Sequence, residues 1–274
     1  MKIQLGHSPD ADDAFMFYAL AYHKIETGEF EFEHVLRDIE TLNQWAREKR
    51  LEVTALSVHA YAYVAKDYAL LPFGASIGDQ YGPIVVADRE MTIAQLKQCK
   101  IAVPGELTTA FLALSLCLGR FSYEVVPFDQ IFNSVKEKRV DAGLIIHEGQ
   151  LTYSNFGFHK VLDLGEWWHE KTDLPLPLGV NGIRKDLGQE NCRKISACLH
   201  DSIEYGLNHR EEALAYAMKY ARDTAKPLTD RFVGMYVNQY TQNLGERGRH
   251  AIDRLLHEAQ TANLIPPVVL EIID

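Results

Sequence analysis

The chain has little cysteine and no long apolar run. Cysteine occupies only four of the 274 positions, and no pair has the CxxC spacing of a metal or redox motif. We therefore expect four buried thiols rather than a disulfide framework. The longest apolar stretches, 110–118 and 142–146, are far shorter than the roughly 20 residues that cross a bilayer. A membrane is accordingly not expected as a partner.

Positive charge is also scarce. Lys and Arg number 28 against 38 Asp and Glu, which gives a formal net charge of -10, and the basic residues form no cluster. Because nucleic-acid binding depends on concentrated positive charge, a nucleic-acid partner is excluded. No apolar leader precedes the strand-like segment 2–5, so we expect a cytoplasmic protein.

The common metal and cofactor motifs are missing as well. No HExxH occurs among the eleven histidines, and the glycines form neither a dinucleotide fingerprint nor a phosphate-binding P-loop. No GxSxG surrounds Ser57, which leaves a serine hydrolase without support. We therefore expect no metal and no cofactor.

What the chain does have is enough apolar residues, 47%, to fill a sizeable core. Up to Leu164 short strand-like segments alternate with helical patterns, and this alternation predicts an α/β fold with mainly parallel sheets. From Gln189 onward the pattern is helical and predicts helices that cover the sheets. The predicted strands are 2–5, 31–36, 53–56, 84–87, 101–103, 124–126, 142–146 and 160–164.

Two segments, 48–56 and 137–145, repeat the same order of residue types. Each has a charged helix end, an acidic residue and a short apolar strand, and the strands lead to Ser57 and His147. Open α/β sheets bind ligands at the carboxyl ends of their strands, so two such units facing each other predict a central cleft. Charged helix ends before buried strands are common, which leaves a chance likeness open.

Two segments that combine glycine and proline mark where the chain could cross between lobes. They are Gly82-Pro83 and 174–179, and each lies beside a predicted strand. We therefore predict one lobe from residues 1–88 together with 179–274, and a second, inserted lobe from residues 89–178.

Polar residues stand at the predicted strand ends. His147 follows an apolar strand, and an imidazole titrates near neutral pH, so it can serve as a proton acceptor; a structural hydrogen-bonding role is the alternative. Thr108 and Thr109 begin a helical stretch whose N–H groups and dipole suit a carboxylate, with simple N-capping as the alternative. Ser57 has the same two explanations. The acids of segment 10–13 complement a helix dipole, which is a sufficient structural explanation for them.

Several short segments, in order along nearly the whole chain, together match one known family. They are Ser8-Pro9 with Asp13, Asp38 to Asn43, Leu56-Ser57, Pro104-Gly105 with Thr108-Thr109-Ala110, Gly143-Leu144-Ile145-Ile146-His147-Glu148, and 174–179. On these segments the chain resembles the 1,4-dihydroxy-6-naphthoate synthases of the futalosine route to menaquinone. Some relatives carry Cys-Pro-Asn-Asp at 10–13, where this chain has Asp-Ala-Asp-Asp, which puts a direct role for Asp12 in doubt.

The resemblance implies a two-lobed periplasmic-binding-protein-like fold of type II with a central cleft, used in the cytoplasm as an enzyme. It implies a lyase that converts cyclic dehypoxanthinyl futalosine, a small carboxylate, to 1,4-dihydroxy-6-naphthoate with loss of a sugar-derived fragment. It also implies that His147 is the proton acceptor. The residues that it implies as substrate contacts are Ala55, Leu56, Ser57, Thr108 and Thr109. Asp38 and Asn43 either line the cleft or cap a helix at 42–50.

This chemistry is consistent with the residues at hand. Removal of one acidic proton beside a carbonyl would start an elimination, and formation of an aromatic ring would draw it forward without a metal or redox cofactor. We hypothesise that His147 takes the proton, that the helix start at Thr108 and Thr109 holds the aryl carboxylate, and that Ser57 positions the substrate.

Two other functions remain as alternatives. One is a binding protein of the same fold that closes on a small carboxylate without transforming it, and the other is chorismate dehydratase. The oligomeric state stays open, with a homodimer as one alternative. An assay with both substrates would separate these functions.

Overall fold

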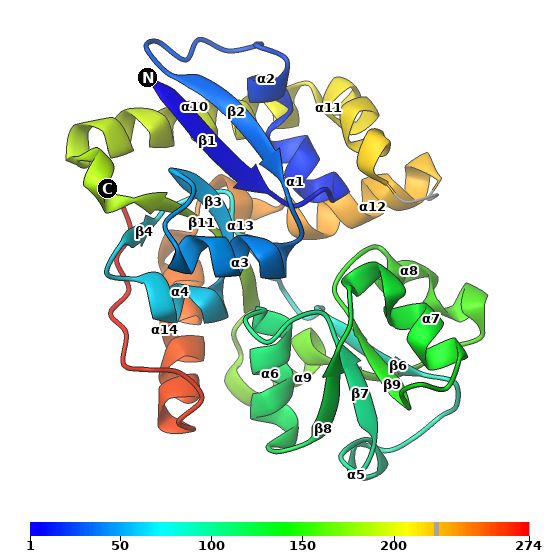
Figure 1. Ribbon diagram of the computed structural model, residues 1–274. Helices are drawn as coiled ribbons and strands as arrows, with labels where there is room; N and C mark the ends of the chain where they lie inside the picture. Colours follow the sequence, from blue (N-terminus) through cyan, green and yellow to red (C-terminus); the bar gives the residue numbers. More distant parts are fainter. Residues whose placement is uncertain (222–224, 274) are drawn as a thin grey trace.

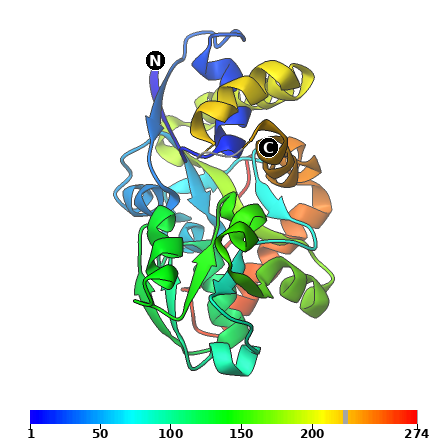
Figure 2. The ribbon, with the colours of Figure 1, turned by 90° about the vertical axis from the view of Figure 1, so that its right-hand side faces the viewer.

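The chain folds into two α/β lobes (Figure 1 and Figure 2). The computed structural model describes residues 1–221 and 225–273. Residues 222–224 and 274, which the predicted first lobe includes, lie outside the described residues. In both views the first sheet is in the upper half of the molecule and the second sheet in the lower half.

The first sheet has the strand order β2-β1-β3-β11-β4, and β5 pairs with β11. The central strand β3 is buried at every residue, and β1 is buried except at Lys2 and Gln4. Its strands are β1 (Lys2–His7), β2 (Glu31–Leu36), β3 (Val53–Ser57), β4 (Tyr68–Leu70), β5 (Ser76–Gly78) and β11 (Leu176–Arg184).

The second sheet has the order β10-β6-β9-β7-β8. Its strands are β6 (Ile84–Ala87), β7 (Lys100–Val103), β8 (Ser122–Val125), β9 (Ala142–Ile145) and β10 (His159–Asp163). Strand β6 pairs along its whole length with β9, so it belongs to the second lobe, although the predicted boundary at residue 88 places it in the first. Likewise β11 pairs with β5 from Leu176, before the predicted return at residue 179.

The prediction of mainly parallel sheets is correct for only part of each sheet. β1 is parallel to β2 and β3, and β7 is parallel to β8 and β9. The strands β6 and β11, by contrast, are antiparallel to their neighbours. These two strands begin where the chain enters and leaves the second lobe, so no helical crossover within one sheet determines their direction.

The helices cover both sheets. The first lobe carries α1 (Ala11–Met16), α2 (Tyr18–Ala21), α3 (Ile39–Arg47), α4 (Val58–Val64), α10 (Gln189–Asn208), α11 (Arg210–Ala217), α12 (Lys226–Tyr236), α13 (Gln239–Gln242) and α14 (Gly245–Thr261). The second lobe carries α5 (Ile93–Leu96), α6 (Thr109–Leu118), α7 (Ile131–Lys136), α8 (Gly149–Thr152) and α9 (Leu164–Thr172). Among the described residues, no helix combines the length and the hydropathy that a membrane span requires.

The two repeated segments have the same backbone structure. Helices α3 and α7 are each followed by a lysine in the left-handed backbone conformation, with φ of 56° at Lys49 and 57° at Lys138. In each case the lysine N–H and the N–H of the following arginine bond back to the carbonyls of the last helical turn. Each segment therefore closes its helix with a Schellman motif before it enters a buried strand. The repeat predicted from sequence is thus a structural one.

The largest apolar core runs through the junction of the lobes. It joins Leu56 and Tyr61 of the first lobe to Leu112 and Trp168 of the second, and Leu255 of α14 belongs to the same cluster. In Figure 1, α14 lies beside α4 below the first sheet. Because these side chains pack together, the lobes share buried surface rather than only a linker.

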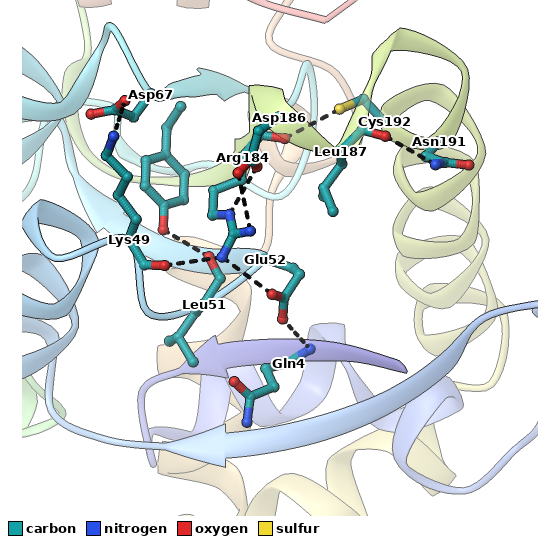
Figure 3. Close-up of polar contacts among 11 residues, drawn as sticks. Gln4, Lys49, Leu51, Glu52, Asp67, Arg184, Asp186, Leu187, Asn191 and Cys192 are labelled. Atoms are coloured by element: carbon teal, nitrogen blue, oxygen red, sulfur yellow. Dashed lines mark hydrogen bonds and ion pairs between the residues drawn. The ribbon is translucent and has the colours of Figure 1, made fainter. Parts of the chain in front are cut away.

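A polar network closes the end of the first sheet that lies away from Ser57 (Figure 3). Arg184 donates to the Lys49 carbonyl at 3.0 Å and to the Glu52 carboxylate at 3.3 Å. Glu52 in turn accepts the Gln4 N–H at 3.0 Å. Strands β1, β3 and β11 are thereby joined at that end, which leaves the carboxyl ends of β1 and β3 for the site.

Candidate active site

A cleft between the lobes encloses about 770 Å³, including open solvent at its mouth. The first lobe contributes most of the wall, from the ends of β1 and β3 and from β11, and the second lobe contributes Thr108, Thr109, Ala110 and Ile146. The polar side chains on the first-lobe wall are Ser8, Asp10, Asp12, Asp13, Ser57, Ser76, Asn181 and Tyr236.

Ser57 lies at the carboxyl end of β3, as predicted, and is held there by Asn43 of α3. The Asn43 Oδ1 accepts the Ser57 N–H at 2.9 Å, and its Nδ2 donates to the Ser57 Oγ at 3.0 Å. Because the Ser57 hydroxyl accepts this hydrogen bond, its own hydrogen is left to donate.

The hydroxyls of Thr108 and Thr109 are both used within the protein. Thr108 Oγ1 caps α6 by accepting the Phe111 N–H and donates to the Gly105 carbonyl. Thr109 Oγ1 donates to the Leu178 carbonyl at 2.5 Å and accepts the His59 N–H at 3.3 Å. Neither threonine hydroxyl therefore has its hydrogen left for a carboxylate. The donors available at this helix start are the first backbone N–H groups, at Thr109 and Ala110.

Helix α3 fastens the turn before α6 to the first lobe. Glu40 Oε2 accepts the Leu107 N–H at 3.0 Å, and Asn43 Nδ2 donates to the Leu107 carbonyl at 3.3 Å. Gly105 lies so close to Glu40 that a Cβ atom there would overlap with the Glu40 side chain. The absence of a side chain at residue 105 therefore permits this contact between the lobes.

We expect the Gly105→Ala substitution to displace Glu40 from the Leu107 N–H. The lost hydrogen bond and the added methyl group should lower the free energy of unfolding by about 1–2 kcal/mol. Urea titration measures this change. Gly234→Ala is the control, because Gly234 lies on α12 and a Cβ there would make only an ordinary contact with the Arg210 side chain. That substitution should stabilise the protein, and an equal loss for both variants would contradict the explanation.

Three carboxyl groups line the cleft where β1 leads into α1. Asp13 accepts the Ser8 N–H at 2.7 Å, and Asp10 accepts from the Ser8 hydroxyl at 2.6 Å. Burial raises the pKa of Asp13 to about 7. Burial and the neighbouring carboxylates Asp13 and Asp10 raise the pKa of Asp12 well above its usual range. Near neutral pH, some of the Asp12 and Asp13 carboxyl groups are therefore protonated and can donate hydrogen bonds.

Two histidines, the buried His7 and the partly buried His34, support the turn that carries these acids. His7 Nδ1 lies 3.1 Å from the Ser8 carbonyl, which only accepts, so Nδ1 carries the ring proton. Its Nε2 therefore accepts from His34 Nδ1 at 3.0 Å. Burial lowers the pKa of His7 to about 3 and that of His34 to about 4. Both rings are neutral at pH 7 and hold the turn without adding charge.

His147 follows β9 and is 9% exposed. Its ring packs edge-on against Phe128 and Phe132, and its Nδ1 accepts the Gly149 N–H at 3.0 Å. The Glu148 carboxylate lies 3.9 Å from the same Nδ1. Neighbouring side chains in a β-strand point to opposite faces, but His147 and Glu148 lie in the turn after β9, so their side chains can approach each other. A protonated ring would be stabilised by this carboxylate.

The predicted site residues fall into three groups. Ala55, Leu56, Ser57, Thr108 and Thr109 line the cleft together. The His147 ring is not among the lining side chains, although its neighbour Ile146 is. Asp38 and Asn43 do not line the cleft.

The last two residues were predicted either to line the cleft or to cap a helix. Asp38 is the N-cap of α3 and accepts the Thr41 N–H at 3.0 Å. Asn43 is wholly buried inside α3, where its amide holds Ser57 and Leu107, so it neither caps the helix nor faces the cleft. Their predicted contact with the substrate therefore has no support from the cleft lining.

Sequence reasoning missed the acids of segment 10–13 and Tyr236 as parts of the cleft wall. The acids were explained by the helix dipole alone, although their place after β1 was a signal for the site. Tyr236 of α12 donates to Gln150 Oε1 of α8 at 2.7 Å and so bridges the lobes beside His147. No group of three or more His, Cys, Asp or Glu side chains in residues 1–221 and 225–273 is arranged to hold a metal ion.

Comparison with known proteins identifies related chains. A family model described as "Menaquinone biosynthesis" matches residues 3–261. A 1,4-dihydroxy-6-naphthoate synthase of Thermus thermophilus is 42% identical, with 97% of this chain and 96% of that protein covered. A protein of the same name from Streptomyces coelicolor is 36% identical, with 96% and 95% covered.

Comparison with solved structures identifies the fold. An Archaeoglobus fulgidus protein has a TM-score of 0.93 at 47% identity, with 96% of this chain and 98% of that chain covered. The alkanesulfonate-binding protein of Xanthomonas axonopodis has a TM-score of 0.75 at 12% identity, with 98% and 96% covered. The predicted periplasmic-binding-protein-like α/β fold is thereby confirmed.

Proposed function

This chain belongs to the menaquinone biosynthesis family, and we propose that it is the enzyme that forms 1,4-dihydroxy-6-naphthoate. Two full-length relatives bear that enzyme's name, and the family model covers nearly the whole chain. The finer proposal is that a lyase reaction in the cytoplasm converts cyclic dehypoxanthinyl futalosine, with loss of its sugar-derived fragment.

The polarity of the cleft is the observation that supports this substrate. At one end, where α3 meets the turn before α6, the Ser57 hydroxyl and the N–H groups of Thr109 and Ala110 are hydrogen-bond donors suited to a carboxylate. The part of the wall beside α1, on which α12 packs, carries Asp10, Asp12 and Asp13. A molecule that carries both an aryl carboxylate and hydroxyl groups can bond to both parts of the wall.

In the proposed reaction, His147 removes a proton beside the substrate carbonyl. The Gly149 N–H occupies the Nδ1 lone pair, so the proton of the neutral ring is on Nε2. To act as the base, Nδ1 gives up the hydrogen bond from the Gly149 N–H and takes the substrate proton. Glu148 then stabilises the resulting imidazolium. The elimination then leads to an aromatic product. A positioned base contributes roughly a hundredfold to ten-thousandfold.

Incubation of the purified protein with cyclic dehypoxanthinyl futalosine tests this function. We expect 1,4-dihydroxy-6-naphthoate to form, as followed by chromatography and mass spectrometry. Chorismate supplied to a parallel sample should remain unchanged, and its dehydration would identify the protein as chorismate dehydratase. Calorimetric binding of the futalosine derivative without any product would instead identify a carboxylate-binding protein.

A further inference from the structure

The orientation of the Asn43 amide is determined by two of its partners. The Ser57 N–H can only donate, so the atom 2.9 Å from it is the amide oxygen. The Leu107 carbonyl can only accept, so the atom 3.3 Å from it is the amide nitrogen. Asn43 is 0% exposed, and both partners belong to the protein, so this orientation does not depend on a bound molecule.

The third hydrogen bond of Asn43, to the Ser57 hydroxyl, can then have only one donor and one acceptor. Its Nδ2 lies 3.0 Å from the Ser57 Oγ, and because an amide NH₂ group has no acceptor, the hydroxyl oxygen must accept. The hydroxyl hydrogen of Ser57 is therefore left to point away from Asn43. Ser57 lines the cleft whereas Asn43 does not, so the available direction for this hydrogen includes the cleft.

We propose that Asn43 is a positioning residue for the reaction, because its amide makes the Ser57 hydroxyl a hydrogen-bond donor to the substrate. The inference rests on the proposed function and deepens it by assigning the polarity of one contact: the substrate atom opposite Ser57 is an acceptor, such as a carboxylate oxygen. Asn43 itself does not touch the substrate.

Aspartate at position 43 would reverse this polarity while changing few atoms. A carboxylate can still accept the Ser57 N–H, but it cannot donate to the Ser57 Oγ. The serine hydroxyl would then donate to the new carboxylate and present only lone pairs to the cleft. A carboxylate of the substrate would meet an acceptor in place of a donor.

A double-mutant cycle of Asn43→Asp and Ser57→Ala tests the proposal. Each single variant should lower kcat/KM for cyclic dehypoxanthinyl futalosine by about tenfold to a hundredfold, the range for loss of a hydrogen bond to a charged group. In the Ser57→Ala background, Asn43→Asp should cost clearly less than it does in the wild type, because no hydroxyl is left to orient and only the lost hydrogen bond to the Leu107 carbonyl remains. The activity of Asn43→Asp relative to the wild type should also recover as the pH falls and the new carboxyl group becomes protonated.

The controls separate the possible failures. Asn191→Asp, on the partly buried first turn of α10, should leave kcat/KM unchanged. If Asn43→Asp does not fold, Asn43→Ser removes the donor without adding charge and should show the same dependence on Ser57. Effects of positions 43 and 57 that multiply in full would overturn the proposal.

Binding of 1,4-dihydroxy-6-naphthoate by the same variants is measured alongside by calorimetry. If the wild type does not turn over the futalosine derivative, the proposed function fails, and the cycle is then decided on binding. Equal dissociation constants for the wild type and Asn43→Asp would overturn the inference on its own.

Discussion

The His147→Ala variant is expected to lose turnover by about a hundredfold to ten-thousandfold while it still binds 1,4-dihydroxy-6-naphthoate. The proposed task of the His147 side chain is proton removal, so its loss should affect the chemical step more than the binding of the product. The ring does not line the cleft, so its removal leaves the donors at Ser57 and α6 in place. The measurements are single-turnover rates and calorimetric dissociation constants.

Two further variants make the test of His147 specific. His147→Gln keeps a polar side chain between Phe128 and Phe132 but cannot take a proton at neutral pH, so it should be as slow as the alanine variant. His250→Ala, an exposed position on α14, should turn over at the wild-type rate. Normal turnover by His147→Ala would show that another group accepts the proton.

The Asp13→Asn variant is expected to be more stable than the wild type above pH 7, by up to about 4 kcal/mol. Burial raises the pKa of Asp13 from its ordinary 3.8 to about 7. The folded state therefore binds this proton more tightly than the unfolded chain does. Stability falls as the pH rises from about 4 to about 7, because ionisation is easier in the unfolded chain. Asparagine cannot ionise, so the variant avoids this loss.

The comparison with pH makes the Asp13 prediction testable. Urea unfolding at pH 8 should show the full difference between variant and wild type, and at pH 4.5 the difference should largely vanish, since Asp13 is then protonated. Asp201→Asn, at an exposed position of α10, should show little difference at either pH. A variant that is destabilised equally at both values would contradict a raised pKa and indicate that the carboxylate is needed for packing.

The parts of the site that follow from local sequence were predictable. Ser57 and the pair Thr108 and Thr109 stand at strand ends or helix starts, and their spacing from apolar strands is visible in the chain. How their hydroxyls are used was not predictable, because the partners of Thr109, Leu178 and His59, are far away in sequence. The same reason explains why Asn43 could not be recognised as an internal bridge.

The fold was predictable to a similar extent. Alternating strands and helices indicated two α/β lobes. The repeat at 48–56 and 137–145 corresponds to two helices that end with the same backbone conformation. The antiparallel strands β6 and β11 could not be recognised, because strand direction depends on which sheet a strand joins. That choice is made by pairing partners such as β9 and β3, which composition alone does not identify.

The bridges between the lobes have protein groups at both ends. Leu107 is held by Glu40 and Asn43, and Gln150 is held by Tyr236. In a receptor that closes around its cargo, part of the binding free energy is used to bring the lobes together. Here hydrogen bonds within the protein already join the lobes, so less of a ligand's binding free energy is needed to bring them together.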